Sequence, residues 1–344
     1  MATMQDVANL AQCSLSTVSY AINNTRPISA ATRQRIEQAM RELDFRPNQI
    51  ARSLASRRSN ILALTFPGTE NTLGSTIMEF VTGAAQAARE RGFHLVVWPY
   101  APAQADEMLQ MSRQGLADGI IVMEVRRDDP RVRLLDEHQI PLTMIGRAED
   151  GTDSRCVDVD FEQTAEAAVA HLAELGHTDV VLLNHSADSR DHGYGPTLRI
   201  AEGFHRAMGR RGLTGQVLWC DETPAAGRRA IDELTGRWPA VTAMVAMNEH
   251  AVIGAVGGLA GRGIAVPQTF SVLSIVTSPL MAQMAEPALT ILHSPGADLG
   301  RLGVQNLLDQ LDGRRPAPAP TLLPCRWEAG RSTGPVPPVI HRPR

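Results

Sequence analysis

Apolar residues recur at helical spacing over the first 45 residues of the chain. Positions three or four apart form one face of each of three short segments, as expected of amphipathic helices. Ser14 and Ser29 stand immediately before the second and third segments, where serine is a favoured N-cap. Three short helices joined by short turns predict a helix-turn-helix head. The apolar positions are Met4, Val7, Ala8 and Ala11, then Val18 and Ile22, then Ile36, Ala39, Met40 and Leu43.

From residue 60 the pattern changes to short apolar runs that alternate with longer amphipathic stretches. Such runs are typical of buried parallel strands, and the stretches between them of covering helices. The repeat is too long for one sheet, so we expect an α/β core of two lobes, each a doubly wound parallel sheet. A ligand would bind between them at the carboxyl ends of the strands. The expected strands are 61–66, 95–98, 119–123, 142–145, 180–183, 217–219, 243–247 and 271–275, and the expected helices are 76–91, 105–116, 162–175, 197–211 and 248–262.

These patterns divide the chain into four segments. The head takes residues 1–46. The linker 47–59 contains a candidate helix at 48–56, which needs a partner because isolated helices under about 12–15 residues are marginal in water. The core takes residues 60–333, with lobe 1 at about 60–160 and 292–320 and lobe 2 at about 161–291 and 321–333. The tail 334–344 lacks periodicity and is expected to be disordered.

Charge separates the head from the rest of the chain. Residues 1–60 carry eight arginines against four acids, a net charge of +4, whereas the whole chain has a net charge of −4. A basic head on an acidic body favours a head that binds a polyanion such as DNA. The four cysteines are far apart and fit neither a zinc motif nor a disulfide framework, so no metal or other cofactor is expected.

The N-terminus lacks the basic-then-apolar layout of a signal peptide. No window contains about 18 uninterrupted apolar residues, the length that predicts a membrane span. We therefore expect a cytoplasmic protein that does not enter a membrane.

The second helix of a helix-turn-helix enters the major groove with its N-terminal residues at the base edges. Leu15 can contact a thymine methyl group, and Ser16 can donate or accept a hydrogen bond. A helical hairpin with no nucleic-acid role is the alternative, which the basic charge of the head disfavours. The predicted base-contacting residues are Leu15, Ser16, Ser19 and Tyr20, and the predicted phosphate-contacting residues are Ser14, Thr17 and Asn23.

The order of short motifs along nearly the whole chain resembles the LacI/GalR family of transcription regulators. Each string is weak alone, but their order and spacing together are specific. The matching strings are Asp6-Val7-Ala8, Ser16-Thr17-Val18-Ser19 and Ile22-Asn23 in the head, Pro47-Asn48 and Ala51-Arg52-Ser53-Leu54 in the hinge, and Asp118-Gly119, Glu202-Gly203-Phe204, Asn248-Glu249, Leu289-Thr290-Ile291 and Arg331-Ser332-Thr333 in the core.

The resemblance implies a repressor that binds a pseudo-palindromic operator in double-stranded DNA as a homodimer. The hinge helices of two subunits would pair only on the operator, where Leu54 wedges into a minor-groove base step and Asn48 and Ala51 lie along the groove. Wedges of this kind kink the duplex at a cost of a few kcal/mol. Closure of the two lobes on a small-molecule effector would shift the subunits and break the hinge pairing.

The core resembles periplasmic sugar-binding proteins but lacks two of their acids. Gly146 and Val276 stand where many relatives have aspartates, which accept hydrogen bonds from sugar hydroxyls. The effector, expected to be a sugar or related metabolite, is then either not a simple monosaccharide or bound mainly by other groups. Alternatively, substitutions elsewhere restore the lost acceptors. The candidate effector-binding residues are Asn71, Thr72, Thr76, Asn184, Tyr194, Arg199, Asn248 and Glu249.

Two other classes of protein share the predicted core. A solute-binding protein of a transporter would have a signal peptide and no helix-turn-helix head. An α/β enzyme would need catalytic groups in the cleft, and the sequence shows no nucleophile–base arrangement and no nucleotide-binding glycine motif. The sequence therefore predicts a ligand-controlled DNA-binding regulator that is not an enzyme.

Overall fold

The computed structural model describes residues 2–23, 26–45, 58–67, 75–100, 104–148, 154–314 and 319–336. It divides into two compact units, one made of Met1–Ile61 with Met111–Asp118 and the other of Leu62–Gln110 with Gly119–Arg344. No helix in the described parts of the chain is long and apolar enough to cross a bilayer.

The head consists of three short helices, as the sequence predicts. Thr3 and Asp6 form a reciprocal capping box at the start of the first helix. Ser14 accepts a hydrogen bond from the Thr17 amide (3.1 Å), and Ser29 accepts one from the Thr32 amide, so each serine caps the helix that follows it. The helices are α1 (Met4–Leu10), α2 (Leu15–Asn23) and α3 (Ala30–Glu42), and their shared core contains Val7, Ala8, Ala11, Val18, Ala21, Ile36 and Ala39.

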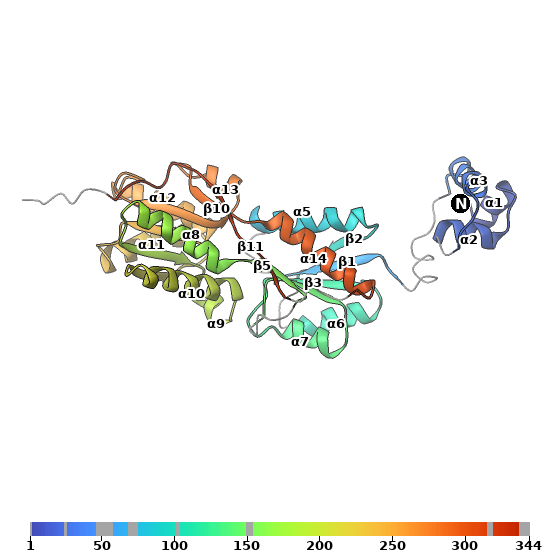
Figure 1. Ribbon diagram of the computed structural model, residues 1–344, viewed down its shortest axis with the longest axis horizontal. Helices are drawn as coiled ribbons and strands as arrows, with labels where there is room; N and C mark the ends of the chain where they lie inside the picture. Colours follow the sequence, from blue (N-terminus) through green and yellow to red (C-terminus); the bar gives the residue numbers. More distant parts are fainter. Residues whose placement is uncertain are drawn as a thin grey trace, which may run out of the picture. The chain divides into compact units, whose positions relative to one another are not determined.

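The first lobe is built on a six-stranded sheet with helices on both faces (Figure 1). Helices α5 (Ser75–Glu90) and α14 (Gly296–Leu311) lie side by side on one face, and α6 (Ala105–Arg113) and α7 (Pro130–Glu137) on the other. The strand order is β11 (Thr321–Leu323), β5 (Cys156–Val159), β4 (Leu142–Ile145), β3 (Gly119–Met123), β1 (Ile61–Thr65) and β2 (His94–Val97).

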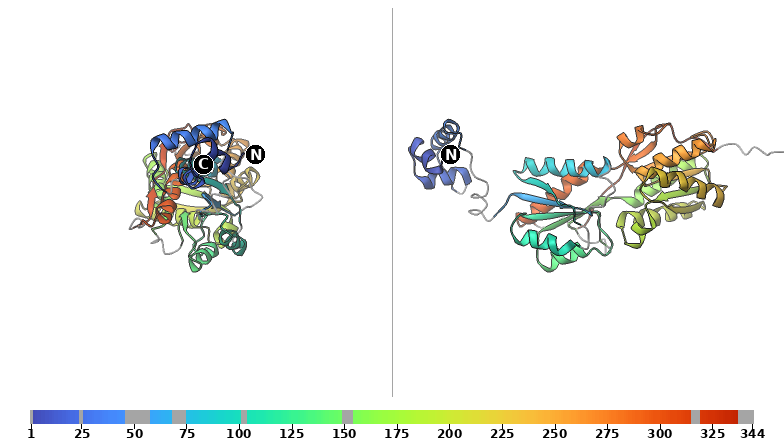
Figure 2. Two further views of the ribbon diagram at one scale, coloured as in Figure 1. Left: turned by 90° about the vertical axis from the view of Figure 1, so that its right-hand side faces the viewer. Right: turned by 180° about the vertical axis from the view of Figure 1, so that it is seen from behind.

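The second lobe repeats this plan, as the view from behind also shows (Figure 2). Its strands pair in parallel except β12, which is antiparallel to β10. The strand order is β12 (Arg326–Glu328), β10 (Thr290–His293), β9 (Ser271–Thr277), β8 (Ala243–Ala246), β6 (Asp179–Asn184) and β7 (Thr214–Trp219). The helices are α8 (Phe161–Glu174), α9 (Ala187–Asp191), α10 (Gly195–Arg210), α11 (Pro224–Arg237), α12 (Glu249–Gly261) and α13 (Pro279–Gln283).

Alternate residues of the second sheet enter two different hydrophobic layers. In β6, Val180 and Leu182 pack into the layer formed with α8 and α10, whereas Val181 and Leu183 pack into the layer formed with α11 and α12. Both faces of the strand are therefore buried, which explains why it reads as an unbroken apolar run in the sequence.

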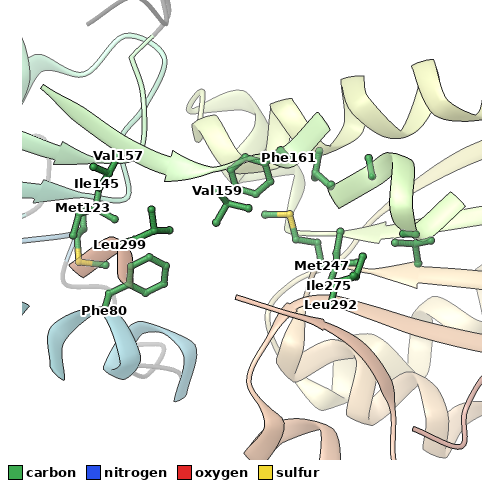
Figure 3. Packing of buried hydrophobic residues seen from close by; sticks show 14 of the residues in the cluster. Phe80, Met123, Ile145, Val157, Val159, Phe161, Met247, Ile275, Leu292 and Leu299 are labelled. Atoms are coloured by element: carbon green, nitrogen blue, oxygen red, sulfur yellow. The ribbon is translucent and has the colours of Figure 1, made fainter. Parts of the chain in front are cut away.

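The first of these layers continues into the other lobe (Figure 3). Val159 and Phe161 lie where the chain passes from β5 to α8, between Ile145 of one lobe and Met247 of the other. The chain crosses between the sheets twice more, between β10 and α14 and between β11 and β12. The lobes thus share one apolar cluster as well as three connections.

The structure corrects several sequence-based expectations. Residues 321–323 belong to the first sheet, not to the second lobe, because β11 pairs in parallel with β5. Strands β5, β10, β11 and β12 were not predicted; they are three or four residues long, and Asp158 interrupts the apolar run of β5. The tail is ordered at its start, since the Gly334 carbonyl accepts a hydrogen bond from His177 or Ser271 and the Val336 amide donates to Leu175. Residues 337–344 lie outside the described part of the chain.

Asp118 anchors the end of the linker at the start of β1. Its carboxylate accepts hydrogen bonds from the Ser59 amide (2.7 Å), the Ser59 hydroxyl (2.9 Å) and the Asn60 amide (2.9 Å). One carboxylate therefore fixes the two residues that precede the first strand, through charge-assisted hydrogen bonds of the stronger kind.

We predict that the second lobe loses stability as His177 becomes protonated. Burial lowers the pKa of His177, which is packed against Thr242, Ser271 and Gly334. The unfolded chain therefore takes up a proton at a higher pH than the folded chain does. The contribution of His177 to the free energy of unfolding should be constant above the ordinary pKa of about 6.5 and decrease as the pH falls below it.

Urea unfolding of the wild type and a His177→Gln variant at about pH 7.5 and pH 5.5 tests this prediction. The wild type should lose more stability between the two pH values than the variant, which retains every other titratable group. An equal loss in both proteins would contradict it.

Candidate functional site

The first turn of α2 presents polar and apolar side chains on the surface of the head. Ser14, Leu15 and Ser16 are exposed, and Leu15 retains 45% of its accessible surface. The hydroxyls of Ser16 and Thr17 each lie 2.7 Å from the Ser14 hydroxyl. Val18, one turn further along α2, is completely buried, so the packing of the head fixes how this helix is turned toward solvent.

The remaining candidate residues of the head are partly buried or lie outside the described structure. Ser19 and Tyr20 are half-buried on α2, and the Arg26 guanidinium lies 5.1 Å from the centre of the Tyr20 ring. The described structure includes the backbone of Asn23 but not its side chain. The hinge candidates Asn48, Ala51 and Leu54 lie outside the described residues.

Hydrogen bonds between the protein's own groups close the region between the two lobes. Thr76 at the start of α5 donates to Glu249 Oε2 (2.7 Å), so these two candidate effector residues bind each other. Nearby, the hydroxyls of Ser75 and Ser278 lie 2.6 Å apart. The other two candidates near the first strand, Asn71 and Thr72, lie outside the described residues.

The two lobes also bind each other through backbone groups. The amide of Arg127 donates to the Gly193 carbonyl (2.8 Å), and the amide of Gly195 donates to the Val125 carbonyl (3.2 Å). A buried arginine fixes the loop on the lobe 1 side: Arg131 donates to the Met123 and Glu124 carbonyls and to both oxygens of Asp129. The salt bridge between Arg131 and Asp129 is completely inaccessible to solvent.

The candidate amides Asn184 and Asn248 are occupied by protein groups. Asn184 donates to the Thr197 carbonyl and accepts from the His185 amide, both at 2.9 Å. Asn248 caps α12 by accepting from the Ala251 amide (3.0 Å) and donates to the Cys220 carbonyl (2.9 Å). In this structure both side chains therefore satisfy buried backbone groups.

The two positions that lack aspartates have unusual backbone conformations. Gly146 has φ +121°, a value that side chains rarely adopt, and an added Cβ would lie 3.1 Å from Val125. Val276 has φ +54°, which is strained for a β-branched residue. An aspartate at 146 would require a different backbone, so the loss of that acceptor is built into the fold here.

Tyr194 stands at the start of α10 beside a histidine–glutamate pair. The ring of His185 lies edge-on to that of Tyr194, with 5.7 Å between ring centres, and His185 Nδ1 lies 3.1 Å from Glu222 Oε1. Burial would raise the pKa of Glu222, but the hydrogen bond and charge of His185 and the Ser186 amide outweigh it and lower the pKa to about 2. Burial raises the pKa of the nearby Glu124.

Arg199 lines a pocket with a volume of about 730 Å³. Its Nη2 donates to the carbonyls of Arg147 (2.7 Å) and Ala148 (3.0 Å), which follow β4 in the other lobe. Arg199 therefore connects α10 to the first lobe. The pocket includes no other candidate from the sequence: it is lined by Arg127, Arg147, Asp160, Phe161, Glu162, Gln163, Glu166, Arg199, Glu202, Arg206, Arg210 and Leu322.

Several polar residues of this region were not among the sequence-based candidates. Glu124, Arg147 and His185 each come within two residues of the end of a buried strand. Because ligands bind at the carboxyl ends of parallel strands, that position was the signal that could have identified them. Among the described residues, no group of acidic, histidine or cysteine side chains could bind a metal ion.

Comparison with known proteins supports both parts of this architecture. A family model described as "Bacterial regulatory proteins, lacI family" matches residues 3–48, and one described as "Periplasmic binding protein-like domain" matches residues 169–333.

Relatives of similar length match almost the whole chain. The HTH-type transcriptional regulator DegA of Bacillus subtilis is 28% identical over 97% of this chain and 98% of its own. The HTH-type transcriptional repressor PurR of Escherichia fergusonii is 29% identical over 92% of this chain and 93% of its own. A structure of the transcriptional regulator CelR in complex with cellobiose superposes with a TM-score of 0.72 at 26% identity, covering 96% of this chain and 100% of CelR. The chain thus combines a lacI-family helix-turn-helix domain with a two-lobed periplasmic-binding-like core, and the relatives that match it over almost its whole length are transcription regulators.

Proposed function

We propose that this regulator is a repressor that binds a pseudo-palindromic operator as a homodimer and is controlled by a small molecule bound between its lobes. The observation that carries the proposal is the exposed first turn of α2, where Leu15 and Ser16 project from a head with a fully packed core. An exposed leucine at the N-terminal end of a recognition helix suits contact with a thymine methyl group.

The surrounding residues of the head suit contacts with the DNA backbone. Ser14 and Thr17 carry hydroxyls at the same end of α2, and together with Asn23 they would bind phosphates. Ser19 and Tyr20, one turn along α2, would complete the base-reading surface. The net charge of +4 over residues 1–60 supplies the non-specific attraction to DNA.

Dimeric binding follows from the size of the head. One recognition helix reads one half-site, so two heads about 34 Å apart on the duplex would read a two-fold symmetric operator. Asn48, Ala51 and Leu54 would pair with their counterparts in the minor groove between the half-sites. The similarity to PurR, which is named a repressor, supports repression rather than activation.

An effector between the lobes would act by competing with the contacts that close them. The bonds of Thr76 with Glu249 and of Arg199 with the residue 147 and 148 carbonyls all join one lobe to the other. A ligand that replaces them changes the free-energy difference between open and closed lobes, and such coupling is typically about 1–3 kcal/mol. The cellobiose bound to CelR supports a carbohydrate-related effector.

We predict that Leu15→Ala weakens operator binding by about 5- to 100-fold, since loss of a base contact costs about 1–3 kcal/mol. The operator would first be selected from random duplexes, and affinity measured by gel retardation at fixed salt. Leu10→Ala is a matched control because Leu10, at the end of α1, is equally exposed at 46%. If Leu15→Ala and Leu10→Ala weaken operator binding equally, or if neither weakens it, α2 is not the recognition helix.

Replacing Leu54 with serine is predicted to reduce operator affinity and the bend in bound DNA together. A serine cannot unstack the central base step, so the contacts that depend on bent DNA are lost. Bending would be measured by fluorescence energy transfer across a labelled operator. Thermal unfolding of the core should stay unchanged, and a variant that bends the operator normally would exclude the wedge.

A further inference from the structure

The pocket around Arg199 is unusual in its density of guanidinium groups. Five arginines line it, at positions 127, 147, 199, 206 and 210, together with four acids and the apolar side chains of Phe161 and Leu322. Its volume of about 730 Å³ lies in the range of small-molecule sites, about 300–1,000 Å³. The charges that remain unpaired within it decide which ligand it can take.

The four acids of the pocket already have partners. Glu202 forms a salt bridge with Arg127, Glu162 with Arg206 (3.4 Å), and Glu166 with Arg210 (2.6 Å). The side chain of Asp160 accepts from the Gln163 amide (2.9 Å) and caps α8. Arg147 is bound to Asp158 by Nε at 3.0 Å. The negative charges of Glu162, Glu166 and Glu202 are thus already compensated by arginines of the same pocket.

Arg199 is the exception among the arginines of the pocket. Among the described residues, no carboxylate lies within salt-bridge distance of its guanidinium, and Nη2 binds only neutral carbonyls. Nη1 is buried and has no hydrogen-bond partner in the described structure. A Cβ on Gly195 would clash with this nitrogen, so a side chain at position 195 would displace the guanidinium from its present place.

A partly buried guanidinium without a carboxylate partner and with an unpaired nitrogen is energetically unfavourable. Burial lowers the pKa of Arg199, and the neighbouring charges of Arg147 and Arg127 lower it further against the opposing effect of Asp158. A buried donor without an acceptor loses its hydration without compensation. A ligand that brings negative charge to this guanidinium would relieve both penalties.

Charge and geometry together select an oxyanion. Phosphate and carboxylate groups match the planar fork of arginine with two parallel hydrogen bonds, which are stronger than bonds to neutral carbonyls. A neutral hydroxyl could fill Nη1 but would leave the positive charge uncompensated. The missing acids at Gly146 and Val276 point the same way, because the cleft has lost acceptors for neutral polyols.

We propose that the effector carries an oxyanion, a phosphate or a carboxylate on a small polar metabolite, and that Arg199 binds this group with Arg147 and Arg127 beside it. The proposal rests on the proposed control by a ligand between the lobes and names the chemistry of that ligand. The oxyanion competes with the residue 147 and 148 carbonyls for Arg199, so binding exchanges a contact between lobes for a contact to ligand.

Titration calorimetry on the full chain tests the proposal with glucose 6-phosphate, gluconate and inorganic phosphate, and with glucose and cellobiose as neutral probes. At least one anionic probe should bind about tenfold or more tightly than either neutral sugar, and Arg199→Gln should reduce that affinity by about tenfold or more. Glucose 6-phosphate and gluconate distinguish phosphate from carboxylate as the preferred group.

Arg206→Gln is the matched control, since Arg206 lines the same pocket but is half-exposed and already paired with Glu162. Its effect on the affinity should stay within about threefold, because an exposed charge pair contributes little. The proposal is overturned if a neutral sugar binds most tightly, if no anionic probe binds at millimolar concentration, or if both variants weaken the anion equally, which indicates unspecific attraction. Circular dichroism melting confirms that each variant is folded.

The oxyanion proposal and the proposed repressor function can be refuted separately. Operator binding in the absence of ligand depends on the head, so gel retardation tests it independently of Arg199. A protein that binds its operator and responds to a neutral sugar refutes only the oxyanion. A protein that binds an anion but no DNA refutes the proposed repressor.

Discussion

The chain crosses between its two lobes three times, and these crossings constrain how the molecule can move. One crossing, from β5 to α8, passes Val159 and Phe161 through an apolar cluster that both lobes share (Figure 3). Because burying apolar surface stabilises by about 25 cal/mol per Å², pulling the lobes apart here would be costly. Motion of one lobe against the other is therefore confined to bending at the crossings, which keeps the carboxyl ends of the two sheets opposed.

The polar contacts between the lobes are of a different kind. A hydrogen bond that involves a charged group contributes about 1.5–3 kcal/mol net, and each of these contacts can be exchanged for a bond to a ligand. The bond of Thr76 to Glu249 and those of Arg199 to the residue 147 and 148 carbonyls are the clearest examples. The shared apolar cluster keeps the two lobes attached, while the hydrogen bonds between them can be exchanged. This combination suits a core whose lobes move relative to each other without unfolding.

In the head, too, buried apolar packing decides which polar and apolar groups are exposed for binding. Val18 and Ala21 of α2 belong to the buried core that the three helices share, and this packing leaves Leu15 and Ser16 in the first turn exposed. At the start of the core, Asp118 fixes Ser59 and Asn60 at the end of the linker. Fixed groups thus stand on either side of the hinge segment that contains Leu54.

By itself, the sequence determined the elements that have a strong local cause. Strands buried on both faces, such as β6, read as unbroken apolar runs, and serine caps marked the starts of α2 and α3. Tertiary structure decided which polar groups are free. Asn184 and Asn248 were candidates for effector binding, but buried backbone groups take up their amides, whereas Arg199 keeps an unpaired nitrogen. Satisfaction of a polar atom depends on groups brought together from distant segments, and no local pattern in the chain encodes that.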